Sequence, residues 1–159
     1  YLGLGYPGGP AIDLPATEGD REAIRFPRPM VGDGTFDVSF SGLKTAVVNH
    51  VRKHPDVATA DVAASFQEAV VDTLLAKGLA AARAVGATGI ALGGGVAANS
   101  RLRERLVERC EAEGLQSFLP SRAMCTDNAA MVAAAGWHRW RLHGPDPLDV
   151  GAVPNLGLA

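Results

Sequence analysis

Cysteine is scarce in this sequence, and its scarcity excludes the small disulfide-stabilised proteins. Only two cysteines, Cys110 and Cys125, are present among 159 residues. Two thiols cannot form a disulfide framework, and the absence of a Cys-x-x-Cys pair gives no indication of a structural zinc site. We therefore expect a cytoplasmic protein whose cysteines are reduced and whose core forms without covalent cross-links.

An excess of positive charge and long apolar runs are also missing. Lysine and arginine total 15 against 17 aspartates and glutamates, so the formal net charge is -2. This balance provides no overall basic surface of the kind that binds nucleic acid. No apolar run approaches the roughly 20 residues that a membrane-spanning helix needs, and we expect no membrane association.

What the sequence contains is an alternation of helical and strand patterns after residue 35. Residues 61–85 carry the strongest helical signal, because Val62, Phe66, Val70 and Leu74 recur four residues apart. Further helices are expected at 99–113 and 127–142, and short buried strands at 90–92 and 116–119. Alternating helices and strands predict an α/β protein.

The first 35 residues are rich in proline and glycine and predict an irregular loop that shapes a ligand site, with one short helix near residues 18–24. Alternation with period two over residues 36–40 predicts a strand, and Ser41 is a candidate N-cap for a helix over 42–52. The expected organisation is an irregular ligand-loop segment at 1–35, an α/β nucleotide-binding lobe at 36–142 and an extended tail at 143–159.

The stretch ALGGGVAANSRL, from Ala91 to Leu102, joins a predicted strand to a predicted helix through three glycines. One interpretation is a tight turn with Asn99 as the helix N-cap. The other is a ligand-binding turn, where exposed backbone N–H groups and the Asn99 amide meet a bound molecule. The stretch is neither a GxGxxG motif nor a P-loop, which disfavours a dinucleotide-binding fold and a P-loop NTPase.

Two further positions are candidates for metal chemistry. Asp127 follows a loop and precedes a helix, so it is either an N-cap or a carboxylate directed at a cation. His50 and His54 lie four residues apart on one helical face, as metal ligands do. The neighbouring Arg52 and Lys53 would repel a cation, and we interpret this pair as ordinary helix C-terminal cations instead.

Six stretches, taken in order, resemble the C-terminal half of the TsaD family, the tRNA N6-adenosine threonylcarbamoyltransferases formerly described as O-sialoglycoprotein endopeptidases. They are YPGGPAID, FPRPM, SFSGLKTAV, DVAASFQEAVVDTL, ALGGGVAANSRLR and CTDNAAM, which together extend over nearly the whole chain. The resemblance implies the C-terminal lobe of an actin-like, sugar-kinase-like ATPase (ASKHA) fold, with a mixed sheet flanked by helices and with the N-terminal lobe absent from this chain.

The resemblance also implies a reaction and its site residues. The family transfers a threonylcarbamoyl group from threonylcarbamoyl-adenylate to N6 of adenosine 37 of tRNA. It implies a metal ligand at Asp127 and no certain catalytic residue. The positions implied to bind the adenylate are Gly9, Asp13, Gly93, Gly94, Gly95 and Asn99.

Cofactors and partners follow from the same resemblance. They are one divalent metal, iron or zinc, and an adenylate or ATP-type ligand, together with tRNA, a paralogous subunit and a small ATPase. The family's His-x-x-x-His metal pair lies upstream of the part that this chain resembles, and His50 and His54 are in the wrong context to replace it. We therefore expect an incomplete metal site and no activity from this chain alone. Two alternatives remain open: a non-catalytic module that binds a nucleotide or a partner, and a sugar kinase or other ATPase of the actin-like fold.

Overall fold

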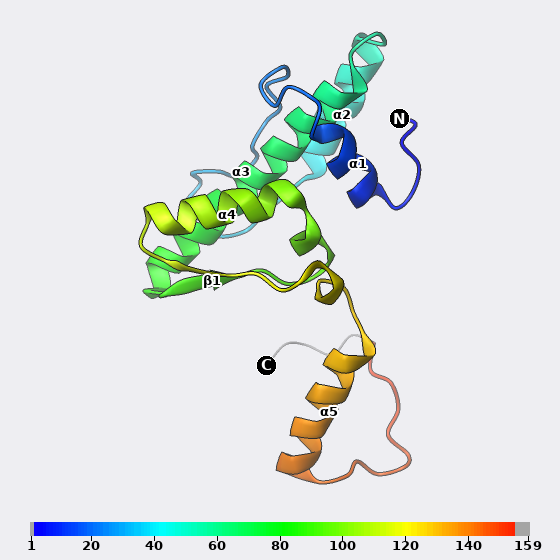
Figure 1. The fold of residues 1–159 in the computed structure, drawn as a ribbon, viewed down its shortest axis with the longest axis vertical. Helices are drawn as coiled ribbons and strands as arrows, with labels where there is room; N and C mark the ends of the chain where they lie inside the picture. The colour runs from blue at the N-terminus through cyan, green and yellow to red at the C-terminus, as the bar shows by residue number, and fades with distance from the viewer. Residues whose placement is uncertain (1, 155–159) are drawn as a thin grey trace. The chain divides into compact units, whose positions relative to one another are not determined.

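The structure is a computed structural model that describes residues 2–154. The chain divides after Cys125 into two compact units, unit 1 and unit 2 (Figure 1). Unit 1 contains the helices α1 (Gly8–Ala16), α2 (Ser41–Lys53), α3 (Thr59–Val85) and α4 (Ser100–Ala112), the strands β1 (Gly89–Ala91) and β2 (Gln116–Phe118), and the 3-10 helices η1 (Gly95–Ala98) and η2 (Arg122–Met124). Unit 2 contains the helix α5 (Ala129–His143).

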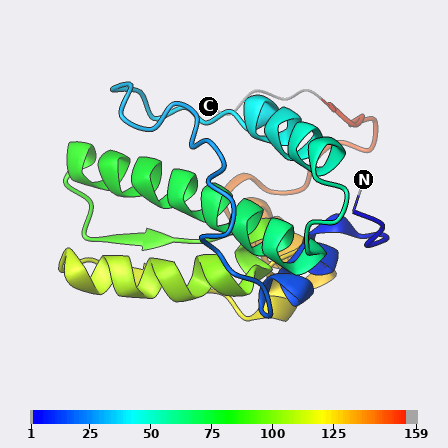
Figure 2. The ribbon, with the colours of Figure 1, turned by 90° about the horizontal axis from the view of Figure 1, so that it is seen from above.

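The sheet of unit 1 consists of β1 and β2, which pair in parallel with Ile90 opposite Ser117. Helix α4 connects the two strands, and α3 and α4 lie on the same side of the sheet (Figure 1). Seen from above, β1 runs between these two helices (Figure 2). The α/β prediction is therefore confirmed. The expectation of a mixed sheet is wrong for the described residues, because the single pairing that they contain is parallel.

Helix α3 contributes side chains to every apolar cluster of unit 1. It packs against α4, against α2 with Phe26, and against α1, and each such contact removes apolar surface from water. The buried members of the three clusters are, respectively, Val71, Leu75, Leu102, Leu106 and Cys110; Phe26, Leu43, Val62 and Ala69; and Ala16, Ala63 and Ala64. Side chains of α3 are thus buried against three other helices, so this helix lies at the centre of the contacts in unit 1.

Polar side chains of α3 hold the segment before α2 against the helix. The Asp20 N–H donates to the Asp61 carboxylate over 2.8 Å. The Ser65 hydroxyl accepts from the Ile24 N–H and donates to the Asp20 carbonyl, each over 3.1 Å. This segment therefore forms turns whose backbone groups are satisfied by α3, and the short helix predicted near residues 18–24 is absent.

Gly19 makes the closest backbone approach in this region. A Cβ atom added there would collide with the Ala60 carbonyl group on α3. Only glycine lets the chain come this near, because any side chain would occupy the space that the carbonyl fills. The hydrogen bond from Asp20 to Asp61, one residue further along, depends on that approach.

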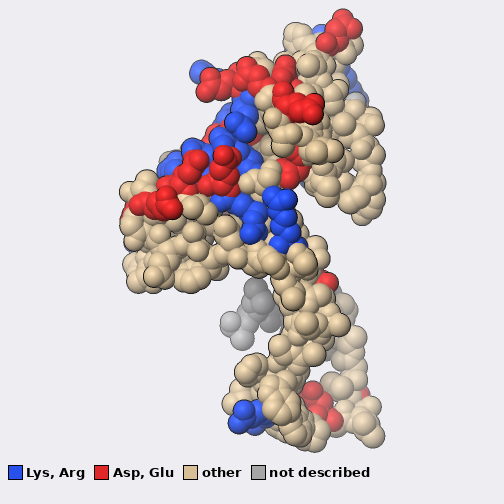
Figure 3. All heavy atoms as spheres, viewed as in Figure 1, with Lys and Arg blue, Asp and Glu red and all other residues tan. Residues whose placement is uncertain are grey.

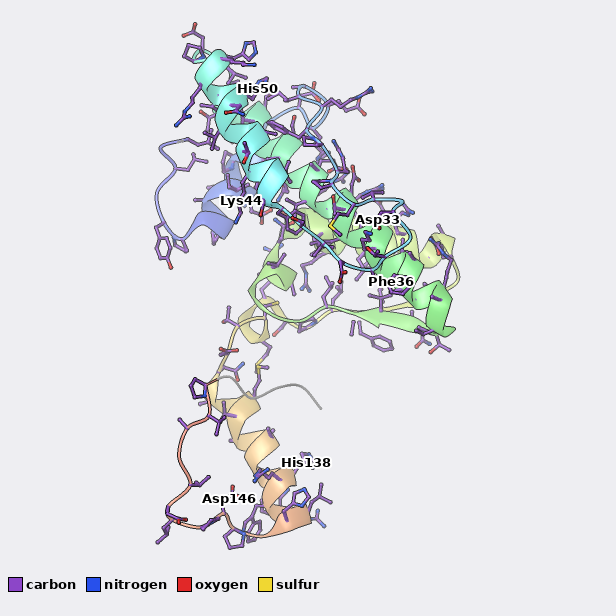
Figure 4. The ribbon with its side chains drawn as sticks, turned by 180° about the vertical axis from the view of Figure 1, so that it is seen from behind. Asp33, Phe36, Lys44, His50, His138 and Asp146 are labelled. Carbon is purple, nitrogen blue, oxygen red and sulfur yellow. The ribbon has the colours of Figure 1, made fainter. Side chains whose placement is uncertain are left out.

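A buried lysine anchors the next loop. The Lys77 ammonium is 6% exposed and donates to the Asp33 carboxylate and to the Thr35 carbonyl, over 2.5 and 2.7 Å. Figure 4 shows Asp33 and Phe36 beside α3 on this loop. The hydrogen bond from Lys77 lowers the pKa of Asp33 from its ordinary 3.8 to about 2, with help from the Thr35 N–H. The loop is thus held by side chains of α3 rather than by a strand ladder.

This anchoring explains why two local predictions fail. Residues 36–40 alternate in polarity, yet they form no strand, because their neighbours bond to α3 instead of to a second strand. Ser41 is the first residue of α2 rather than its cap, and the N-cap residue, Phe40, makes no side-chain capping bond.

Helix α1 lies inside the segment predicted to be irregular. Proline usually interrupts helices, but Pro10 lies in the first turn, where the missing N–H has no intrahelical acceptor anyway. The apolar contact of Ile12 and Ala16 with Ala63 and Ala64 of α3 stabilises the helix. Packing that the local sequence does not reveal therefore decides its conformation.

Unit 2 is built around α5, none of whose side chains is buried. Asn128 caps this helix, since its side chain accepts a hydrogen bond from the Met131 N–H over 3.1 Å. In the loop that follows, Asp146 forms an ion pair with Arg139 of the helix. Figure 4 marks Asp146 together with His138 on the helix. No helix among residues 2–154 is long and apolar enough to cross a membrane.

The Lys77–Asp33 contact predicts a specific pH dependence. Replacing Asp33 with asparagine should lower the unfolding temperature at pH 7, because the buried ammonium loses its anionic partner. Because the pKa of Asp33 is depressed in the folded state, its stabilisation is complete above about pH 4 and is lost as the pH falls towards 2. The difference between wild type and variant should therefore shrink over that interval in melts followed by circular dichroism.

The matched control is Asp37→Asn, on the same loop, since Asp37 forms no ion pair in the described part of the chain. It should melt like wild type at every pH. A difference between wild type and Asp33→Asn that stays constant from pH 7 to pH 2 would contradict the assigned contact.

Candidate functional site

A cavity of about 370 Å³ opens in unit 1 where the start of α1, the middle of α3 and the start of α4 meet. Its walls are mainly apolar. The side chains and backbone that line it come from Gly8, Gly9, Ile12, Phe66, Gln67, Val70, Val71, Leu74, Val96, Asn99 and Leu102. Two residues predicted from sequence, Gly9 and Asn99, therefore lie at one cavity, although 89 positions of chain separate them.

Asn99 is the N-cap of α4. Its backbone has the extended conformation that capping requires, and its side-chain oxygen accepts a hydrogen bond from the Leu102 N–H over 2.9 Å. Its amide nitrogen donates to the Asp13 carboxylate over 3.2 Å. The capping interpretation is confirmed, and both the oxygen and the nitrogen of the amide are hydrogen-bonded in a residue that lines the cavity.

The Asp13 carboxylate is the polar hub of the site. Besides the Asn99 amide, it accepts from the Ser100 N–H at 3.2 Å, from the Ser100 hydroxyl at 2.6 Å and from the Gln67 amide at 2.5 Å. Ser100 is the first residue of α4, so its N–H has no acceptor inside the helix. The negative charge also lies favourably at the positive end of the helix. Asp13 thus ties α1 to α3 and α4.

Gln67 and Ser100 are site residues that the sequence analysis missed. Gln67 is 6% exposed and belongs to α3, where it interrupts a mostly apolar buried face. A buried amide in such a row needs a partner, and this was the signal available in the sequence. Ser100 follows the helix cap directly, and its role depends on Asp13, which is distant in sequence.

The first turn of α1 is bare towards the cavity. A Cβ atom at Gly8 or Gly9 would meet nothing within 4 Å, so the two glycines leave the helix backbone accessible. The N-cap residue, Pro7, makes no side-chain capping bond, and no acidic residue lies in the first turn. The N-terminus of α1 therefore keeps its positive partial charge available to an anion.

The three glycines after β1 have separate structural roles. Gly94 has a φ of 76°, a left-handed conformation that disfavours other residues, and it precedes η1. Gly95 begins η1. Gly93 lines a smaller neighbouring cavity of about 260 Å³, to which Val96 also contributes. The turn thus lies beside the first cavity through Val96, which lines both.

An ion pair fixes the beginning of α4 relative to α3. Arg101 donates to Glu68 through two nitrogens, at 2.7 and 2.9 Å, and both side chains are about 15% exposed. The hydrogen bond from Arg101 lowers the pKa of Glu68 below its ordinary value. On the face of unit 1 seen in Figure 3, basic and acidic side chains lie next to one another in this way. The arrangement holds Asn99, two residues earlier, in place.

Asp127 lies in unit 2, where it is exposed and precedes the capping residue of α5. Its interpretation as an N-cap is wrong, because Asn128 fills that role. Residues 2–154 contain no group of three or more histidine, cysteine, aspartate or glutamate side chains arranged to hold a metal ion. The described residues do not by themselves fit the metal that the resemblance implies.

The chain is similar to proteins of one described family. A family model described as TsaD, tRNA N6-adenosine threonylcarbamoyltransferase, matches residues 1–134. A protein of that name from Thermotoga neapolitana is 50% identical over 157 residues, which are 99% of this chain and 48% of the relative. One of the same name from Clostridium botulinum is 47% identical over 161 residues, at 99% and 47% coverage. The chain thus spans about half the length of the curated relatives it matches.

The hub at Asp13 predicts a stability effect. Asp13→Ala should reduce the free energy of unfolding by about 1–3 kcal/mol, because the donors of Gln67 and Ser100 lose their acceptor. Chemical denaturation followed by circular dichroism measures the difference. Asp56→Ala, at an exposed position between α2 and α3, is the control and should stay within about 0.5 kcal/mol of wild type. Equal stabilities of the two variants would refute the hub.

Proposed function

The chain belongs to the TsaD family of tRNA N6-adenosine threonylcarbamoyltransferases, and from this premise we propose that it supplies the adenosine-binding part of such an enzyme. The reaction is the transfer of a threonylcarbamoyl group from threonylcarbamoyl-adenylate to N6 of adenosine 37 of tRNA. The observation that carries the proposal is the apolar cavity at which Gly9 and Asn99 meet. In fold terms, unit 1 belongs to the C-terminal lobe of an actin-like ATPase.

The cavity has the size and polarity that a nucleoside needs. Its volume of about 370 Å³ is within the usual range for small-molecule sites. Phe66, Val70 and Leu74 of α3 offer an apolar wall for a purine ring. The uncapped first turn of α1 at Gly8 and Gly9 suits the phosphate of an adenylate, because unpaired N–H groups and the helix dipole both favour an anion.

Asn99 is prepared for a contact with the nucleoside. A primary amide has two donor hydrogens and two acceptor lone pairs. Bonds to Asp13 and Leu102 use one of each and fix the orientation of the side chain. One donor and one acceptor remain for the ligand. Because the amide is already ordered, binding costs little additional side-chain entropy.

The chemistry then depends on positioning rather than on a protein nucleophile. The N6 amine of adenosine 37 attacks the carbamoyl carbon, a C–N bond forms, and the bond from that carbon to the adenylate oxygen breaks. AMP leaves with the bonding electron pair, and the amine proton passes to solvent. Gly9 and Asn99 hold the adenylate in place, which lowers the barrier by bringing the reactants together.

Partners are part of the proposal for the whole protein. They comprise tRNA, threonylcarbamoyl-adenylate, a paralogous subunit and a small ATPase, in the cytoplasm. A divalent metal held partly by Asp127 belongs to the same proposal. It needs ligands beyond the described residues, which contain no suitable cluster.

Binding of AMP tests the adenosine site. The chain should bind AMP weakly in isothermal titration calorimetry, and Asn99→Ala should weaken binding at least tenfold, about 1.4 kcal/mol. Asn99→Ser keeps an oxygen that can cap α4 but removes the amide donor, and it should lose affinity as well. The matched control, Asn128→Ala, removes the corresponding cap of α5 and should bind like wild type. An unchanged affinity in Asn99→Ala would exclude the proposed contact.

An assay of transferase activity tests whether this chain alone can catalyse the family's reaction. The chain supplied with threonylcarbamoyl-adenylate and tRNA should form no modified adenosine above background, because the described residues lack a complete metal site. Mass spectrometry of digested tRNA gives the measurement, and the Thermotoga neapolitana relative serves as positive control. Formation of threonylcarbamoyladenosine by residues 1–159 alone would show that this chain suffices.

A further inference from the structure

Arg103 joins the two loops that leave the carboxyl ends of the parallel strands. Its side chain starts from the first turn of α4. One guanidinium nitrogen, Nη1, donates to the Ala97 carbonyl in the loop after β1, over 2.9 Å. The other, Nη2, donates to the Pro120 carbonyl in the loop after β2, over 2.8 Å. A single planar group thus spans both loops.

The same guanidinium lies against the end of the second loop. Nη1 is 3.9 Å from Sγ of Cys125, and this thiol donates to the Ser121 carbonyl over 3.5 Å. Cys125 is 2% exposed although the residues on either side of it are exposed. The contacts of Arg103 and Ser121 therefore fix the path of the chain at Cys125.

Arg103 differs from the other arginines of α4 in its choice of partners. Arg101, Arg105 and Arg109 each form an ion pair with a glutamate. Among residues 2–154, Arg103 forms no ion pair with a carboxylate, and its hydrogen bonds go to two backbone carbonyls and a sulfur. The rigid fork of a guanidinium suits two acceptors at fixed separation, which the point charge of a lysine does not.

We propose that Arg103 is a positioning residue: by binding the loop after β2 as well, it holds the loop after β1 in place at the cavity. The loop after β1 ends at Asn99, which lines the cavity, and the loop after β2 reaches Cys125, the last residue of unit 1. Arg103 acts through the Ala97 and Pro120 carbonyls and does not itself touch the ligand. This inference rests on the proposed function for what Asn99 contacts, whereas the bridge between the loops is independent of it.

Accessibility of the Cys125 thiol measures the bridge directly. The chain and its variants are treated with N-ethylmaleimide, and labelling of each cysteine is followed by peptide mass spectrometry. In Arg103→Met, Cys125 should label at least tenfold faster than in wild type. Cys110, which is fully buried in the cluster between α3 and α4, should label at the wild-type rate. Arg109→Met, on the same helix, is the matched control and should change neither rate.

Arg103→Lys distinguishes the contribution of the two guanidinium donors from that of the positive charge. It keeps the cation but not the two parallel donors, so Cys125 should still label faster than in wild type. Labelling at the wild-type rate in either Arg103 variant overturns the inference. A parallel rise at Cys110 and Cys125 also overturns it, because it would show general loosening of the fold rather than release of one loop.

AMP binding connects the bridge to the site. In Arg103→Met the affinity should fall about tenfold, while Arg109→Met should bind as wild type does. If wild-type protein binds no AMP, the proposed function fails, and the labelling experiment still decides whether Arg103 holds the loops. If AMP binds equally well to wild type and Arg103→Met while Cys125 is released, the positioning role is refuted and the proposed function stands.

Discussion

Unit 1 depends on one long helix that is buried along most of its length. Helix α3 supplies apolar side chains to each cluster of the core, and its polar side chains bind four other segments of the unit. Asp61 and Ser65 hold the turns at residues 20–24, and Gln67 holds helix α1. Glu68 holds the start of α4, and Asp72 and Lys77 hold the loop at residues 28–35. One helix therefore provides both the apolar core of unit 1 and the polar contacts that fix the positions of its loops.

The contacts of α3 with α1 and α4 also determine the geometry of the candidate site. Asp13 does not face the cavity as an unpaired carboxylate, since Gln67 of α3 and Asn99 and Ser100 of α4 all donate to it. The hydrogen bonds to its carboxylate hold three helices together at the point where the cavity opens. What remains accessible to a ligand is the backbone of the first turn of α1 and the unused half of the Asn99 amide. The groups that we propose to bind the adenylate are therefore held in place by contacts between side chains of the three helices.

The sequence predicts best what local interactions decide. The long helix, the cap at Asn99 and the α/β class follow from periodicity and capping chemistry, and the structure has all three. Prediction fails where distant residues decide: α1 forms in spite of its prolines because α3 covers it, and residues 36–40 stay irregular because Lys77 holds the preceding loop. The partners of Asp13 lie 54 to 87 positions away, so no local pattern could indicate that they bind Asp13, although the apolar row around Gln67 does indicate that its amide needs some partner.

Gly19 illustrates a different kind of constraint. It touches no cavity residue named for the adenylate, yet the carbonyl of Ala60 leaves no space for even one methyl group beside it. The fold therefore requires glycine at this position for steric reasons, whereas Gly9 is a glycine that we propose to contact the ligand. A count of the glycines that relatives share therefore cannot distinguish those that contact a ligand from those that the fold requires. To map substrate contacts, one must ask which atoms lie next to each glycine.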